Sequence, residues 1–229
     1  GEANKAKFIL NSTGIIIGVD NADAPFICKI VEDSGAGAVE KPFRTLNAAV
    51  NYARQYMGGT ATIEMLVDYD IPDSDRVTLG VNTITVDSTS VTVTDNITIT
   101  TAAASGGMYN FVDTQSGKAS IDKGTAVLTR GFDGDSLFTV NNETASLAME
   151  SVILDGNIKT GKAIDMQNGA LSIKDAAVRG FQSDDGAVYL GSGSVTFTQT
   201  SHSQAFEKAK EISTVAVLLG RNSEGFTDR

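Results

Sequence analysis

Three charged residues occupy matching positions in the sequence and could form a reactive cluster. Arg130, Asp155 and Arg179 each stand immediately before a glycine, in the segments TRGF, LDGN and VRGF. If these segments stack as neighbouring strands, the side chains form an Arg–Asp–Arg ladder with about 5 Å between successive residues. A carboxylate in such a cluster could hold Ca²⁺ against an acidic sugar while a basic side chain takes a proton. The pattern makes these three residues candidate catalytic residues.

Further aspartates follow in the adjoining turns. Asp133 and Asp135 are candidates for a Ca²⁺ ion bound in a turn, although the segment lacks the spacing of a complete EF-hand loop. Asp184 and Asp185, with Tyr189 facing outward from the next strand, are candidate ligand-binding residues. A structural interpretation stays open for all of these charges, because alternating signs on neighbouring strands also relieve like-charge repulsion.

Other kinds of chemistry find little support. A Ser–His–Asp site would have to use His202, the only histidine, for which a packed or capping role is favoured. Cys28 lies in the apolar segment FICKI, which favours a buried, inert thiol. Pairs such as Asp68 and Asp70 have the residue types for glycoside hydrolysis, but such pairs in turns are commonly only solvated. No glycine-rich nucleotide-binding motif is present, so we expect no cofactor, with Ca²⁺ left open as the one alternative.

The elements that must position these residues begin with one amphipathic helix, predicted over 45–57. Apolar residues at steps of 4, 3 and 4, starting from Leu46, share one helical face. Thr45 can cap the first turn with its hydroxyl group. Gly58 and Gly59 end the helix, because glycine accepts the left-handed conformation found there.

Short strands with alternating apolar residues follow the helix. Turn residues separate them, and the apolar pairs predict strands around 63–65, 77–79, 84–86, 91–93 and 97–99. No second helix is expected between residues 60 and 205, which argues against a fold of alternating strands and helices.

A spacing of 24 residues relates the segments SLAMESVILDG, ALSIKDAAVRGF and SVTFTQTSHSQ. Their equivalent apolar residues are Leu147, Leu171 and Val195, followed by Met149, Ile173 and Phe197. The first repeat carries two extra residues in its turn, NNETAS against QNGA and GSGS, and the segment AVLLG at 216–220 begins a further copy. Each repeat holds three short strands, and a helix-free period of this length predicts a solenoid.

We therefore predict an all-β fold, a right-handed parallel β-helix with about 24 residues per coil and an N-terminal capping α-helix. Residues 1–60 form the cap, with strands and the helix, and residues 61–229 form the coils of the same continuous domain. The helix would cover the open apolar end of the first coil. A β-sandwich is the alternative, because Asp-Gly turn signals occur at 133–134, 155–156 and 185–186.

The segment KPFRTLNAAVNYA, followed by TIEMLVDYDI, resembles the entry segment of pectate-lyase-like right-handed β-helix proteins. There a phenylalanine and a threonine open a capping helix, and the later coils resemble those of secreted bacterial surface proteins and adhesins. The resemblance implies the fold and an extracellular or cell-surface location, with a signal peptide removed. It implies no single activity, because this fold hosts lyases, hydrolases and non-enzymatic adhesins. The acidic cluster that marks the lyases is not recognisable here.

The net charge and the distribution of apolar residues limit the kinds of partner that we expect. The chain has 229 residues and a net charge of -10, so it should repel nucleic acid and anionic membranes. It contains no apolar run long enough to insert into a membrane. We expect a non-enzymatic surface or adhesin-type domain that binds a glycan or protein on a host or cell surface. The alternative is a polysaccharide lyase or glycoside hydrolase acting on an acidic polysaccharide.

Overall fold

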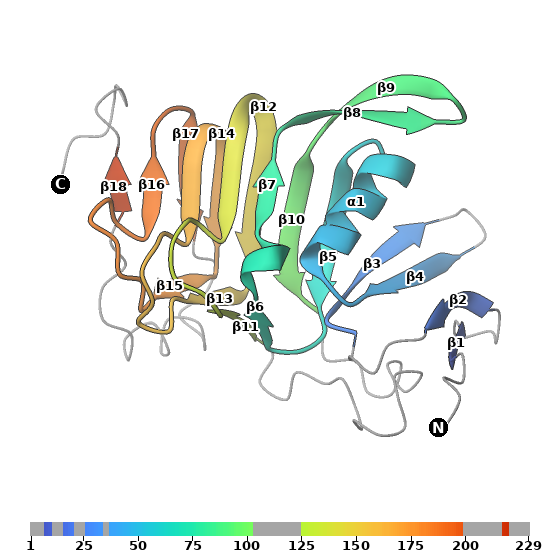
Figure 1. Cartoon of the computed structure of the whole chain (residues 1–229), viewed down its shortest axis with the longest axis horizontal. Coiled ribbons are helices and arrows are strands. Elements are labelled where there is room, and N and C mark those ends of the chain that lie inside the picture. Colours follow the sequence, from blue (N-terminus) through green and yellow to red (C-terminus); the bar gives the residue numbers. More distant parts are fainter. Residues whose placement is uncertain are drawn as a thin grey trace.

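A computed structural model describes residues 26–33, 37–102 and 125–198 in full, together with the backbone of three strands at 7–10, 16–20 and 217–219. β-Strands dominate these residues (Figure 1). They include one α-helix, α1 (Leu46–Tyr56), and one short 3-10 helix, η1 (Asp73–Asp75). The predicted dominance of β-structure with a single helix is confirmed for the described part of the chain.

Most of the described strands belong to one ten-stranded sheet and one four-stranded sheet. The larger sheet contains, in spatial order, β18 (Val217–Leu219), β16 (Val188–Leu190), β14 (Ile164–Lys174), β12 (Phe138–Glu150), β10 (Asn96–Thr101), β5 (Thr60–Met65), β3 (Cys28–Asp33) and β4 (Ala38–Phe43), with β17 (Ser194–Thr198) beside β14 and β7 (Val77–Leu79) beside β12. The smaller sheet contains β15 (Ala177–Arg179), β13 (Val152–Asp155), β11 (Ala126–Arg130) and β6 (Tyr69–Ile71).

The larger sheet is mixed. Strand β3 runs antiparallel to both β4 and β5, whereas the pairs from β5 through β10, β12 and β14 to β17 are parallel. Two antiparallel hairpins form separate sheets, β1 (Lys7–Leu10) with β2 (Ile16–Asp20), and β8 (Val81–Val86) with β9 (Thr89–Thr94).

The 24-residue spacing appears as strand register. Leu147 lies opposite Leu171, and Leu171 lies opposite Val195. Leu147 and Leu171 are buried in the core, while the alternate position Ser172 is partly exposed. This alternation places the apolar side chains in the core, and burial of each large one stabilises the fold by about 1.5–3 kcal/mol of transfer free energy. The equivalent position predicted at His202 lies outside the described residues.

The two extra residues of the first repeat are accommodated within β12. The register of β12 against β14 shifts between Val140 and Ser146, and Ser146 resumes opposite Ala170. Because side chains alternate with a period of two, an insertion of two residues leaves every later side chain on its original face.

Helix α1 begins and ends as its sequence predicts. Thr45 is the N-cap and accepts a hydrogen bond from the Ala48 amide at 3.1 Å. A second cap comes from Asp75, a buried carboxylate that accepts hydrogen bonds at 2.8 Å from the amides of Leu46 and Asn47. This remote cap joins the start of the helix to the 3-10 helix η1 and was not predicted from the sequence.

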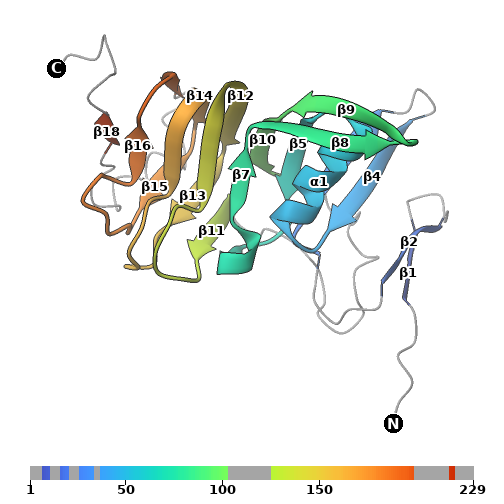
Figure 2. The same cartoon turned by 45° about the horizontal axis from the view of Figure 1, so that its top comes forward.

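The strands predicted at 84–86 and 91–93 form, but they pair with each other as the β8–β9 hairpin and not with the parallel strands. Both residues of its turn, Asp87 and Ser88, have positive φ, as a type I′ hairpin turn requires. The hairpin lies beside α1 and extends past it (Figure 2). Buried Asp95 holds its base, accepting hydrogen bonds from Arg54 and from the Gly80 amide.

Replacing Asp75 should weaken the link between α1 and η1. In Asp75→Ala the amides of Leu46 and Asn47 and the Tyr69 hydroxyl lose their acceptor, which should lower the free energy of unfolding by about 1–3 kcal/mol. Denaturant unfolding measures this change. The exposed neighbour variant Asp73→Ala is the control and should change stability by about 0.5 kcal/mol or less. Equal stability of the two variants would contradict the assigned role.

Candidate functional site

The structure brings together only two of the three predicted ladder residues. Asp155 and Arg179 lie opposite each other on β13 and β15, with Arg179 Nε 2.7 Å from Asp155 Oδ2. The residue opposite Asp155 on β11 is Thr129, not Arg130. Arg130 lies opposite Ile71 of β6 and is fully buried. The predicted Arg–Asp–Arg ladder is therefore wrong at Arg130, because a shift of one residue turns a strand side chain to the other face.

Buried Arg130 is held by main-chain oxygens. Its Nη1 donates to the carbonyls of Phe132 and Gly134 at 3.4 and 3.0 Å, and its Nη2 donates to those of Asp135 and Lys162. Burial lowers the pKa of Arg130, partly opposed by the negative charge of Asp133. The side chain cannot reach a substrate on the surface, so it is not available as a catalytic base.

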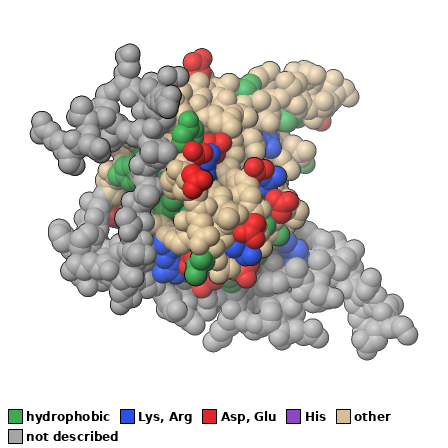
Figure 3. Space-filling view, turned by 60° about the vertical axis from the view of Figure 1, so that its left-hand side comes forward, with side chains coloured by type: hydrophobic (Ala, Val, Ile, Leu, Met, Phe, Trp, Pro, Cys, Tyr) green, Lys and Arg blue, Asp and Glu red, His purple; other side chains and the backbone are tan. Residues whose placement is uncertain are grey.

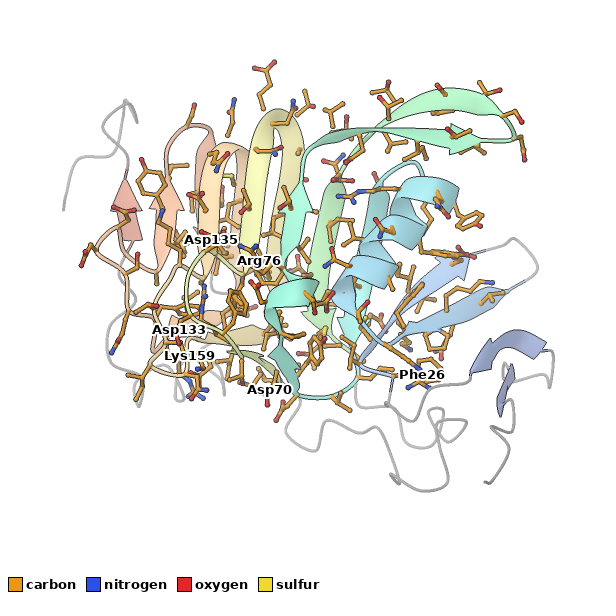
Figure 4. The ribbon with its side chains drawn as sticks, in the orientation of Figure 1. Phe26, Asp70, Arg76, Asp133, Asp135 and Lys159 are labelled. Carbon is orange, nitrogen blue, oxygen red and sulfur yellow. The ribbon has the colours of Figure 1, made fainter. Side chains whose placement is uncertain are left out.

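The two aspartates proposed for Ca²⁺ binding have separate partners. Asp133 accepts hydrogen bonds from the amide and hydroxyl of Thr160, and these bonds lower its pKa. Lys159 lies beside it, whereas Asp135 lies beside Arg76, with Asp135 Oδ2 2.6 Å from Arg76 Nη1 (Figure 4). Among the described residues, no group of three or more His, Cys, Asp or Glu side chains is arranged to hold a metal ion.

The residues predicted to bind a ligand lie near one lysine. Asp185 Oδ2 is 3.0 Å from Lys162 Nζ, and the same ammonium group lies 4.7 Å from the centre of the Tyr189 ring. Asp184 is exposed in the turn before β16. The structure thus brings Asp185 and Tyr189 together through Lys162, a residue that the sequence did not single out.

A surface cavity of about 520 Å³ connects several of these groups. It is lined by Arg76, Gly134, Asp135, Ser136, Thr139, Gly161, Lys162, Asp165, Gln167 and Ser183. The lining comes from the turns that precede β7, β12, β14 and β16, and from the outward positions of β12 and β14. On those strands Thr139 lies opposite Asp165, and Asp165 lies opposite Tyr189, so the strand register sets their spacing.

The charges around the cavity neutralise one another in local groups. Arg76 contacts Asp73 and Asp135, and Lys162 contacts Asp165 and Asp185, at distances of 2.6 to 3.8 Å. Acidic and basic side chains are likewise interspersed on the described surface that faces forward in Figure 3. The cavity therefore offers many hydrogen-bonding groups without a strong field of one sign.

The pKa of Lys162 follows from this environment. Burial alone would lower it, but the hydrogen bond to Asp185 and the charges of Asp165 and Asp185 outweigh burial and raise it. Lys162 is therefore a permanent ammonium group at neutral pH, suited to donating hydrogen bonds and not to accepting a proton.

Other candidates occupy structural positions. Cys28 is buried, and burial raises its pKa well above the usual range, so the predicted inert thiol is consistent with its surroundings. Asp68 accepts a hydrogen bond at 2.8 Å from the Val127 amide, and Asp70 is exposed on β6. No α-helix of the described residues is long and apolar enough to cross a membrane.

Comparison with known proteins assigns no family, because no protein-family model, curated protein or solved structure matches the chain. The resemblance to pectate-lyase-like proteins stays a prediction.

The Asp155–Arg179 pair should behave as an ordinary surface ion pair. Its side chains keep 23% and 34% of their accessible surface, so solvent screens the interaction. A double-mutant cycle of Asp155→Ala and Arg179→Ala should give a coupling of about 0.2–1 kcal/mol in the free energy of unfolding. A coupling above about 2 kcal/mol would contradict this assignment, because it exceeds the range typical of solvent-screened ion pairs.

Proposed function

We propose that the parallel strands are coils of a right-handed parallel β-helix, with α1 covering its first coil. Support comes from the 24-residue register between Leu147, Leu171 and Val195, and from a chain path that alternates between the two sheets from β11 to β16. Right-handedness follows from the general rule for connections between parallel strands. The buried face of α1, at Leu46, Ala49, Val50 and Ala53, fits the role of an end cap.

On this scaffold we propose a non-enzymatic, extracellular or cell-surface domain that binds a glycan in the cavity lined by Lys162, Asp165 and Gln167. The observation that carries the proposal is the cavity lining, in which carboxylate and amide acceptors alternate with lysine, arginine and hydroxyl donors. A sugar hydroxyl both donates and accepts hydrogen bonds, so it can be paired on such a surface. The partly exposed ring of Tyr189, next to Lys162, can pack against an apolar sugar face.

Charge and shape favour a neutral glycan over the other partners considered. An acidic sugar would have to displace Asp135 or Asp165 from the cations that they already neutralise. A protein partner requires a broad interface of about 800 Å² on each side, whereas a cavity of about 520 Å³ is in the range of small-ligand sites.

The same contacts argue against catalysis. Arg130 is buried beneath the turns, and Arg179 is held by Asp155. Lys162 stays protonated, so it cannot act as the proton acceptor that a lyase needs.

The test is a binding screen with neutral and acidic oligosaccharides, followed by titration calorimetry and analysis of new reducing ends. We expect a neutral glycan to bind without cleavage, and Asp165→Asn or Gln167→Ala to weaken the affinity about tenfold, near 1.4 kcal/mol. Asp87→Asn, an equally conservative change in the exposed hairpin turn, is the matched control and should leave the affinity unchanged. Release of products, or binding only of acidic sugars, would refute the proposal.

The contribution of Lys162 to binding should be independent of pH over the neutral range. Because its pKa is raised, the ammonium group persists up to and beyond about pH 10.4, the ordinary lysine value. The affinity difference between the protein and Lys162→Met should be the same at about pH 7 and about pH 9, and should decrease only at higher pH. Lys174→Met, which affects an ion pair with Glu150 outside the cavity lining, is the control. A difference that disappears by about pH 9 would contradict the assigned charge state.

A further inference from the structure

The environment of Arg130 is unusual for a buried charge. The side chain is fully buried, and in the described part of the chain its hydrogen bonds go to four carbonyl oxygens and not to a carboxylate. Its Nε atom is buried without a hydrogen-bond partner. Burying a guanidinium group is costly, and an apolar residue of similar size would fill the same volume without that cost. The charge therefore requires an explanation other than packing.

The four carbonyls belong to two turns of successive repeats. Phe132, Gly134 and Asp135 lie in the turn before β12, and Lys162 lies in the turn before β14. Both turns line the cavity, through Gly134, Asp135, Gly161 and Lys162 among others. A single planar guanidinium group thus fixes the distance between the two turns, and its rigid fork of donors suits this role.

Aromatic rings add a third point of attachment. The guanidinium carbon lies 4.5 Å from the centre of the Phe132 ring and 5.6 Å from that of Phe181. Phe181 precedes Ser183 in the next turn along the stack, and Ser183 also lines the cavity. Contacts of this kind hold the plane of the guanidinium group in one orientation.

Gly161 shows how closely the two turns approach each other. Its φ is +115°, and a Cβ atom there would overlap the carbonyl oxygen of Gly134 and lie 2.8 Å from Arg130 Nη1. Only glycine fits this position without displacing one turn from the other. A substitution at 161 therefore offers a way to disturb the same contact without changing Arg130.

We infer that Arg130 is a positioning residue that clamps the turns 131–136 and 156–162 together and so holds the cavity in its binding shape. The inference rests on the proposed function for its consequence, glycan binding, but the clamp itself can be measured without a ligand. By holding Asp135 and Lys162 at fixed separation, the clamp removes an ordering cost that a ligand would otherwise have to offset.

Hydrogen exchange tests the clamp in the ligand-free protein. The amides of Gly134 and Leu137 donate to the carbonyls of Thr160 and Lys162, and so report whether the two turns stay together. In Arg130→Met these two amides should lose at least tenfold of their protection, while the β12–β14 ladder at Met149 keeps its own. Unchanged protection at Gly134 and Leu137 would overturn the inference.

Binding measurements test the consequence, with Gly161→Ala as the second variant in case Arg130→Met does not fold. Gly161→Ala should weaken glycan affinity at least tenfold and reduce protection at Gly134. Gly193→Ala is the matched control, because Gly193 also has positive φ, at +94°, and its Cβ would overlap the carbonyl of Gly169, away from the cavity lining. It should lose comparable thermal stability but keep its affinity within about twofold.

The two proposals fail in different ways. If the unaltered protein binds no glycan, the proposed function is refuted, and hydrogen exchange still decides whether Arg130 holds the turns. If Gly161→Ala and Gly193→Ala weaken binding equally, or Gly161→Ala leaves protection at Gly134 unchanged, the clamp is refuted even though glycan binding stands.

Discussion

In-register stacking of parallel strands is the constraint on which the rest of this structure depends. Leu147, Leu171 and Val195 follow one another across β12, β14 and β17, and any slip by one residue would turn their side chains out of the core. Strands fixed in this way also fix the turns between them. The cavity exists because the turns before β12, β14 and β16 are stacked on one another, which brings together residues that lie far apart in the sequence.

Three buried charged side chains form hydrogen bonds with irregular backbone segments that lie outside the hydrogen-bond ladders of the strands. Asp75 accepts the first amides of α1, Asp95 holds the base of the β8–β9 hairpin, and Arg130 gathers the carbonyls of two turns. In each case the partners include main-chain groups that would otherwise be left unpaired on leaving water, and Asp95 also pairs with the Arg54 side chain. The exposed charges near the cavity, by contrast, are paired with one another, which leaves a polar but nearly neutral surface for a ligand.

The sequence predicts local elements and register well, because both follow from periodicity. The helix near 45–57 and the opposition of Leu147 and Leu171 are confirmed. The predicted ladder was wrong because it aligned Gly131 with Gly156, which are 25 residues apart. In the structure Thr129 lies opposite Asp155, and these two residues are 26 apart. That separation is the 24-residue period plus the two extra residues of NNETAS. An alignment that is wrong by one residue places a side chain on the opposite face of its strand. Arg130 is therefore buried while Arg179 lies at the surface, although the segments TRGF and VRGF are similar.

Other features had no signal in the sequence. The helix cap by Asp75 and the antiparallel pairing of β8 with β9 depend on contacts between segments that are not related by the 24-residue period. In the sequence alone, nothing distinguishes the cavity residues Lys162, Asp165 and Gln167 from other exposed polar residues, because only the stacking of the strands brings them together. Asp165 alone could have been found, as an outward position in register with Tyr189, once the 24-residue register was applied to charged residues as well as apolar ones.

The most direct measurement of glycan binding in the cavity is amide chemical-shift mapping of the protein during titration with the neutral oligosaccharide that binds most tightly. If the cavity binds the glycan, the largest shifts should occur at Gly134, Ser136, Gly161, Gln167 and Ser183, and the sugar should be recovered intact afterwards. Shifts concentrated on the β8–β9 hairpin or on α1, or an oligosaccharide recovered in cleaved form, would contradict it.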